Sequence, residues 1–182
     1  MTEPASDSAK PIHAFLNQPW WAMGQRVPGH AHPRINETAT RARAGILNAL
    51  SATTVFLLLA APQTDPVLYV GPFVIFDMLA AAFFGLTPCS PVGVLGTLLT
   101  MGARPVWKPI APKRFAWLLG AGLGAVCLTM RGLGVAPVWI AGVVGVCFAL
   151  TWLEAALGFC VGCWMHSLLF DCEDCDVKYV RA

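Results

Sequence analysis

Two cysteines, Cys160 and Cys163, form a Cys-x-x-Cys pair at the end of the last long apolar segment. If this segment is helical, residues three apart lie on one face, so the two thiols are predicted to lie side by side. Such a pair can be a redox dithiol, in which one thiolate attacks a disulfide and the other thiol resolves it. It can also bind a metal ion, or it can simply pack as small apolar side chains. The redox interpretation is the one we favour, and the other two stay open.

A second pair, Cys172 and Cys175, follows on a short acidic tail. Together the four cysteines give two metal-binding knuckles, and four thiolates suit tetrahedral zinc or iron. The surrounding carboxylates should raise the thiol pKa values, which disfavours Cys172 as a nucleophile. They do not disfavour it as a metal ligand, because the charge of the ion reverses this effect.

Three other residues deserve a functional interpretation. His166 continues the cysteine face of a regular helix, whereas Glu154 should point to another neighbour. Asp77 lies near the middle of the second apolar segment and Glu154 lies inside the fourth. Charged groups at such depth are costly, so they suggest a proton path or a buried ion pair. The structural alternative is that Asp77 bonds to Asn48 or to the backbone, and that His166 is an interfacial hydrogen-bonding residue.

The composition indicates an integral membrane protein. The chain has 182 residues, of which 57% are hydrophobic and only 12% charged, and its mean hydropathy is +0.63. Soluble proteins carry about twice this charged fraction, so lipid must face much of the surface. A net charge of +2 is too small to suggest nucleic acid as a partner.

The apolar segments predict an all-α fold of four transmembrane helices, with a short interfacial or re-entrant helix between the second and third. We expect the spans at about 45–61, 67–86, 115–130 and from 138 onward, and the short helix at 92–101. Asn36 or Thr38 should cap the first helix and Ser90 the short one. The prolines of 104–114 should exclude a regular helix there. The apolar pattern of the last span continues to Phe170, so we expect this helix to tilt or to project past the membrane.

Three regions follow from this pattern: a polar arm over 1–44 with Trp20 and Trp21, a membrane domain over 45–170, and the acidic tail over 171–182. Basic residues gather on one side of the predicted bundle, and only Arg131 lies on the other. The positive-inside rule then predicts that both termini are cytoplasmic, in a bacterial inner membrane. The clustered cysteines would lie in a compartment where thiols are normally reduced.

Several motifs together resemble a bacterial family of small four-helix membrane proteins known only as a domain of unknown function. The motifs are Ile35-Asn-Glu with Arg41, Phe76-Asp77, Ser90-Pro91, Pro112-Lys-Arg-Phe-Ala116 and Gly158-Phe-Cys-Val-Gly-Cys163. The resemblance would cover about Ile35 to Leu169. It implies the four-helix membrane fold and singles out the Cys160 pair, but it implies no activity. In that family an Asn is common where this chain has Glu154, and the tail cysteine pair is not a family feature.

Two functions remain as hypotheses. The first is thiol redox or sulfur handling, with Cys160 or Cys163 as the attacking residue, Asp77 as a proton-handling group and a thiol-redox partner. The second is a non-enzymatic accessory subunit of a larger membrane complex, whose cysteines bind zinc or iron or only pack. Trp20, Trp21 and the tails would then be its contacts with the other subunits.

Overall fold

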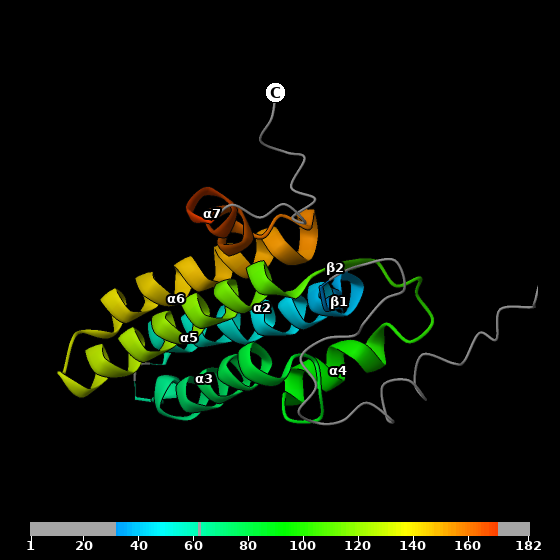
Figure 1. Ribbon diagram of the computed structural model, residues 1–182. Helices are drawn as coiled ribbons and strands as arrows, with labels where there is room; N and C mark the ends of the chain where they lie inside the picture. Colours follow the sequence, from blue (N-terminus) through cyan, green and yellow to red (C-terminus); the bar gives the residue numbers. More distant parts are fainter. Residues whose placement is uncertain (1–31, 62, 171–182) are drawn as a thin grey trace, which may run out of the picture.

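The computed structural model describes residues 32–61 and 63–170, and this part of the chain is almost entirely helical (Figure 1). The elements in order are β1 (Arg34–Asn36), α2 (Glu37–Ala60), α3 (Pro66–Phe84), α4 (Pro91–Leu99), β2 (Trp107–Pro109), α5 (Ile110–Gly132), α6 (Pro137–Trp152), η1 (Leu153–Leu157) and α7 (Val161–Leu169).

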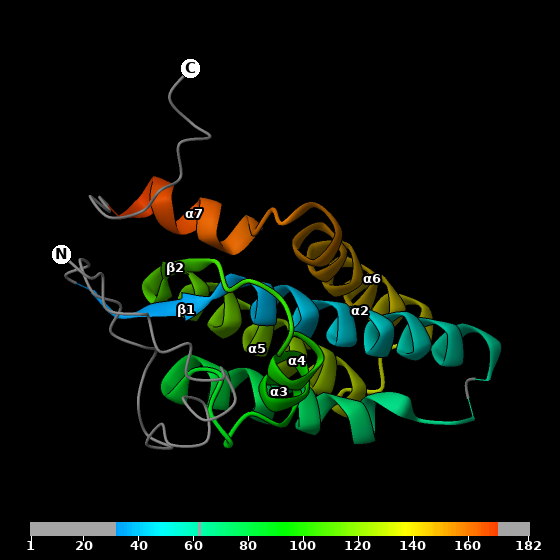
Figure 2. The same cartoon turned by 90° about the vertical axis from the view of Figure 1, so that its right-hand side faces the viewer.

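Four helical segments are long and apolar enough to cross a membrane: α2, α3, α5, and α6 together with η1. They form two packed pairs, in which α2 lies against α6 and α3 lies against α5 (Figures 1 and 2). This arrangement confirms the predicted all-α fold with four spans. Many large apolar side chains on these helices are exposed, as Phe56 and Phe76 are, which is expected of helices whose outer faces contact lipid.

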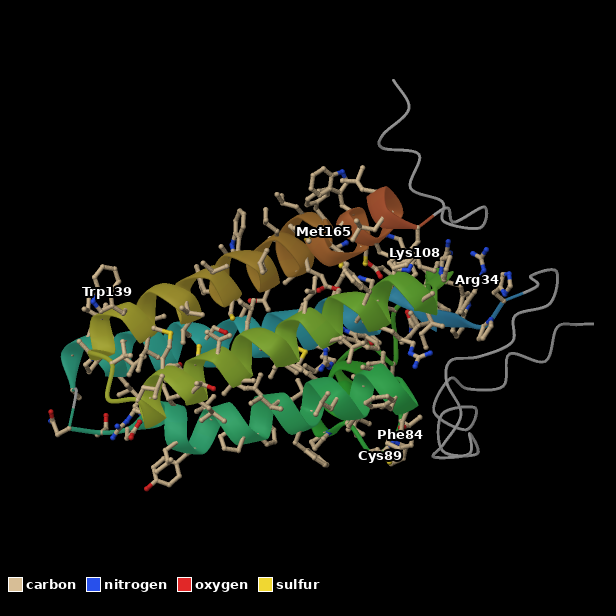
Figure 3. The ribbon with its side chains drawn as sticks, turned by 60° about the vertical axis from the view of Figure 1, so that its left-hand side comes forward. Arg34, Phe84, Cys89, Lys108, Trp139 and Met165 are labelled. Atoms are coloured by element: carbon tan, nitrogen blue, oxygen red, sulfur yellow. The ribbon has the colours of Figure 1, made fainter. Side chains whose placement is uncertain are left out.

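One end of the bundle, which we call the polar end, carries β1, β2, α4 and α7 (Figure 1). Arg34 and Lys108 lie at this end, while Trp139 lies near the opposite one (Figure 3). The two short strands are antiparallel, with Ile35 opposite Lys108. This pairing ties the residues before α2 to the basic connector before α5, and the sequence pattern did not predict it.

Two predicted helix starts are confirmed. The Asn36 side chain accepts a hydrogen bond of 3.0 Å from the Thr38 backbone N–H, so Asn36 is the cap of α2. The Ser90 hydroxyl oxygen accepts from the Gly93 N–H at 3.1 Å, and Pro91 takes the first position of α4. A Cβ on Gly96 would lie 2.8 Å from the Ala39 carbonyl oxygen, so only glycine lets α4 pack this closely against α2.

Two predicted boundaries are wrong. Helix α5 begins at Ile110 rather than at 115, because Pro112 falls in the first turn, where its missing N–H has no partner to lose. The fourth span does not continue to Phe170 as one long helix. It passes through the π-helical turn η1 and ends at Gly158, whose φ of 68° is left-handed, and α7 then starts as a separate helix.

Candidate functional site

Cys160 stands at the start of α7 and caps it. Its backbone is extended, and its sulfur accepts a hydrogen bond of 3.3 Å from the backbone N–H of Cys163. The two cysteines therefore do not lie within one continuous helix, but their thiols are side by side as predicted, since the side chains hydrogen-bond to each other. Gly158 ends the preceding helix. Cys160 is the residue just before α7, and Cys163 lies in the first turn of α7. Both cysteines are free thiols.

Close packing fixes the position of α7. A Cβ on Gly162 would lie 2.6 Å from the Ala116 Cβ, well inside van der Waals contact. The first turn of α7 therefore lies directly on the first turns of α5. Since Ala116 closes the Pro112-Lys-Arg-Phe-Ala motif, the two sequence motifs meet at this contact.

A buried lysine lies beside the cysteine pair. The Lys113 ammonium is 2.9 Å from Glu37 Oε2 and 2.6 Å from Glu154 Oε1. The side chains of Lys113 and Glu37 are 3% and 5% exposed, so this ion pair is buried. Lys113 and Glu154 both act electrostatically on Cys160 and Cys163. Glu154 points to another neighbour, as expected, because its carboxylate pairs with Lys113 of α5.

The groups around the two thiols shift their pKa values in opposite directions. The hydrogen bond from the Cys163 side chain lowers the pKa of Cys160, and the positive charge of Lys113 adds to this effect against burial and Glu154. The hydrogen bond to Cys160 raises the pKa of Cys163, and burial raises it further. The two shifts have opposite directions, so Cys160 loses its proton more readily than Cys163. Thiolates, rather than thiols, are the reactive form of cysteine.

His166 does not extend the thiol pair. Its ring packs edge-on against Phe115, with 5.7 Å between centroids, and lies 4.8 Å from the ring of Phe170. Burial among these rings lowers the pKa of His166. Its Nδ1 has no hydrogen-bond partner among the described residues, so the expected interfacial hydrogen bond is not formed by that nitrogen.

Asp77 lies in a different cluster at the polar end. It is fully buried, and its carboxylate is 2.6 Å from the Arg43 guanidinium. It also accepts hydrogen bonds from the Ser90 hydroxyl at 2.7 Å and from the Val92 N–H at 2.9 Å. Of the two partners predicted for Asp77, the backbone is confirmed by the Val92 N–H, whereas Asn48 is wrong. Asn48 instead donates to the Phe148 carbonyl oxygen at 2.8 Å.

A model of the family described as "Domain of unknown function (DUF4395)" matches residues 35–170. The chain belongs to this family. No curated protein and no solved structure matches it. The match to DUF4395 begins at the second residue of β1 and extends through α7. It therefore includes both buried ion clusters and the cysteine pair.

The metal interpretation of this DUF4395 protein is not tested. In residues 32–61 and 63–170, no group of three or more His, Cys, Asp or Glu side chains is placed to hold a metal ion. Cys172 and Cys175 lie outside the described residues. A site made by Cys160, Cys163, Cys172 and Cys175 therefore stays a prediction.

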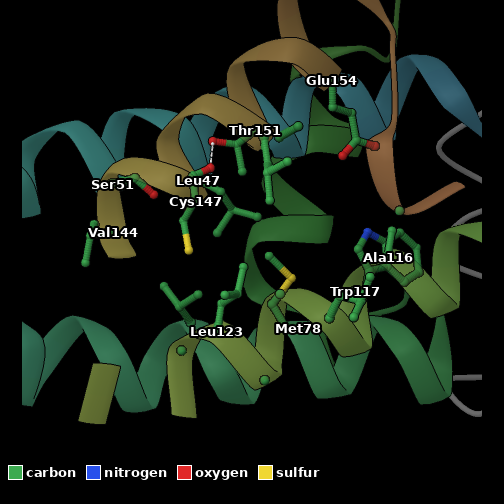
Figure 4. A pocket seen from close by; sticks show the side chains of 18 of the residues that line it. Leu47, Ser51, Met78, Ala116, Trp117, Leu123, Val144, Cys147, Thr151 and Glu154 are labelled. Atoms are coloured by element: carbon green, nitrogen blue, oxygen red, sulfur yellow. Dashed lines mark hydrogen bonds between the residues drawn. The ribbon is translucent and has the colours of Figure 1, made fainter. Parts of the chain in front are cut away.

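A cavity of about 780 Å³ lies between the two helix pairs and reaches the cysteine site. Its wall is mainly apolar, and Ser51, Met78, Trp117 and Cys147 surround it (Figure 4). Cys160 and Glu154 line it as well. The cavity thus adjoins the buried ion cluster through Glu154 and the cysteine pair through Cys160.

Proposed function

We propose that this DUF4395 protein is a membrane thiol oxidoreductase in which Cys160 forms the mixed disulfide with a partner and Cys163 is its internal pair. One observation carries the proposal: Cys160 is the cap of a helix, bonded to the Cys163 N–H, with the buried Lys113 nearby. The N-terminal end of a helix and a nearby cation both stabilise a thiolate.

The chemistry is thiol–disulfide exchange. In the oxidised pair, a thiolate of the partner attacks the Cys160 sulfur, the Cys160–Cys163 bond breaks, and Cys163 leaves and takes up a proton. The second thiolate of the partner then attacks the partner sulfur that is bonded to Cys160, and Cys160 is released as a thiolate. The partner gains a disulfide, and the pair becomes a dithiol. A low pKa makes Cys160 a good leaving group and stabilises the reduced pair, so exchange favours oxidation of the partner.

The location proposed for this exchange is the cytoplasmic face of a bacterial inner membrane. Basic residues gather at the polar end and in the tails, while Arg131 lies at the opposite end, which supports this orientation by the positive-inside rule. The basic residues are Lys10, Arg26, Arg34, Arg41, Arg43, Arg104, Lys108, Lys113, Arg114, Lys178 and Arg181. In such a compartment the disulfide would be transient, as catalysis requires.

The proton-handling role of Asp77 stays a prediction, and its contacts support another role. The carboxylate binds Arg43 of α2, Ser90 and the first turn of α4. We propose that Asp77 holds these three helices together and takes no part in the exchange.

Trapping with glutathione disulfide tests the proposal. In the purified Cys163→Ala variant, we expect Cys160 to attack glutathione disulfide and to keep the glutathione, visible by intact mass. The Cys163→Ala variant keeps the backbone N–H that bonds to the Cys160 sulfur, whereas Cys163 has no such bond in the matched Cys160→Ala variant and should react about tenfold or more slowly at neutral pH. Equal rates for the two variants, or no adduct on Cys160, would show that the site is not a dithiol of this kind.

The competing function is a non-enzymatic subunit whose cysteines bind metal or pack. Native mass spectrometry of the full chain separates it from the oxidoreductase. A bound zinc or iron ion that is lost in a Cys172→Ala variant would make the four cysteines a metal site. Additional subunits that stay bound after mild extraction from the host membrane, in a chain whose Cys160 is inert, would support the accessory role.

A further inference from the structure

The cavity between the helix pairs has the size and lining of a site for a small lipophilic molecule. Its volume of about 780 Å³ falls in the usual range for small-molecule sites, about 300 to 1,000 Å³. Four glycines line it: Gly71 of α3 and Gly120, Gly122 and Gly124 of α5. Most other lining side chains are apolar, and the polar ones are few.

Some residues that line the cavity also lie on the outer surface of the bundle. Leu118, Leu119 and Val126 line it while 44%, 38% and 47% of their surfaces are exposed. These residues belong to α5, a helix long and apolar enough to cross the membrane. A molecule entering here would come from the lipid phase rather than from water.

The polar end of the cavity offers a hydrogen-bond donor without a partner. Arg43 is only 2% exposed and lines the cavity, and its Nε has no hydrogen-bond partner in the part of the chain that the structure describes. The guanidinium lies 5.1 Å from the centre of the Trp117 ring, which also lines the cavity. A buried donor without a partner is unfavourable, and an acceptor oxygen on a ligand would satisfy it. The flat Trp117 ring suits a planar headgroup.

We propose that this cavity binds a membrane quinone and that the quinone takes the electrons of the Cys160–Cys163 dithiol. The inference rests on the proposed thiol exchange, which leaves the pair reduced and in need of an electron acceptor. A quinone has a planar ring, carbonyl oxygens that accept hydrogen bonds, and an apolar tail for the apolar remainder of the cavity. Since Cys160 lines the same cavity as Arg43, the ring would lie between the donor and the thiolate.

The electrons of the reaction balance within these groups. The Cys160 thiolate adds to a ring carbon of the quinone and forms a carbon–sulfur bond. Cys163, once deprotonated, attacks the Cys160 sulfur; the disulfide forms, and the carbon–sulfur bond breaks with its electron pair passing to the ring. One proton of the quinol comes from Cys163 and the second from solvent, because Cys160 enters the reaction as a thiolate. The pair loses two electrons, and the quinone gains them.

Two matched variants of α2 test the proposal. Ser51 lines the cavity, whereas Thr53 is exposed on the same helix and does not line it. The full-length protein is reduced, freed of reductant and mixed with decylubiquinone, and quinol absorbance and Cys160–Cys163 disulfide are followed together. The wild type and Thr53→Phe should form quinol and disulfide in equal amounts. Ser51→Phe, which fills the cavity, should do so about tenfold or more slowly.

Exchange with glutathione disulfide, measured on the same three proteins, separates the two proposals. The rate of this exchange should be the same in all three proteins. If the exchange with glutathione disulfide proceeds but the wild type forms no quinol, the quinone proposal fails and the thiol-exchange proposal stands. Equal quinol rates for Ser51→Phe and Thr53→Phe, or a copurifying phospholipid that the quinone does not displace, would also overturn it. If Cys160 does not exchange at all, both proposals fail.

Discussion

At the scale of single residues, the site depends on a lysine that brings together three parts of the sequence. Lys113 joins Glu37 of the first span to Glu154 of the fourth, and its charge acts on Cys160. A charge buried in this way needs its partners, and removing one partner leaves an uncompensated charge. Lys113 therefore links the stability of the polar end to the reactivity of the thiol.

The pH dependence of alkylation tests this link. The Cys163 hydrogen bond and the Lys113 charge lower the pKa of Cys160, so its thiolate persists to lower pH than that of an ordinary cysteine, whose pKa is about 8.5. The rate of alkylation at Cys160 by iodoacetamide should therefore reach half its maximum below that pH. Lys113→Met should move this midpoint upward, while Lys113→Arg, which keeps the charge, should move it less. A midpoint that is the same in all three proteins would contradict the account.

The Asp77 cluster makes a separate prediction about stability. Asp77→Asn leaves the buried Arg43 charge without its counter-ion, at a cost of about 3 to 5 kcal/mol in the free energy of unfolding. The control is Asp65→Asn at the opposite end, because Asp65 pairs with Arg131, a residue whose side chain is 49% exposed. Exposed pairs contribute about 0 to 1 kcal/mol. Denaturant unfolding in detergent should separate the two variants clearly, and equal losses would refute the structural role of Asp77.

The sequence predicted some of these residues and not others. The spacing of Cys160 and Cys163 was visible, because paired thiols are rare enough to be noticed. Asp77 was also visible, because a carboxylate inside an apolar segment is costly. Glu37 and Lys113 appeared as members of the motifs that carry the family resemblance, with no role assigned to either. Only the packing of α2, α5 and η1 buries them together, and no local pattern reports that packing.

At the scale of elements, the break between η1 and α7 creates the site. Gly158 adopts a left-handed φ of 68°, which other residues adopt only at a cost of about 1 to 2 kcal/mol. This break lets Cys160 become a helix cap rather than a residue inside a helix. Because Cys160 caps α7, its sulfur accepts the hydrogen bond from the Cys163 N–H.

Substituting the glycine tests this element. Gly158→Ala should shift the chain toward a continuous helix, displace α7 from α5 and raise the pKa of Cys160 toward its ordinary value. The alkylation rate at neutral pH should therefore fall. Gly132→Ala is the matched control, because a Cβ there meets no atom within 4 Å and the residue lies far along α5. Unchanged alkylation in Gly158→Ala would mean that the break is not needed for the thiolate.

The elements themselves were largely predictable, and their exact limits were not. Apolar runs of sufficient length predicted the four spans, and the Ser90-Pro91 pair predicted the start of α4. The apolar pattern continued past Gly158, so periodicity alone could not show that the helix stops there. A single backbone angle at one glycine decides this boundary.

At the scale of the whole molecule, the two ends of the bundle differ in the polar groups that they hold. The polar end holds both buried ion clusters, the short strands and the thiol site, while the opposite end has the exposed Arg131–Asp65 pair. The proposed orientation puts the polar end in the cytoplasm. A membrane-impermeant maleimide can test it on a background whose seven cysteines are replaced by alanine.

Two exposed loop positions serve as reporters in that background. Leu133→Cys lies at the opposite end and should be labelled from outside intact spheroplasts. Ala103→Cys lies before β2 at the polar end and should be labelled only after the membrane is opened. The reverse pattern would place the thiol site outside the cytoplasm and would change the class of partner it can meet.

The central claim is that Cys160 and Cys163 cycle between a dithiol and a disulfide. The most direct measurement is the intact mass of the full-length protein, with peptide mapping, after equilibration in glutathione buffers from fully reducing to fully oxidising. The account predicts a reversible loss of two hydrogens, mapped to one peptide that contains a Cys160–Cys163 bond. A pair that stays reduced in every buffer, or that carries only a metal ion, would contradict it.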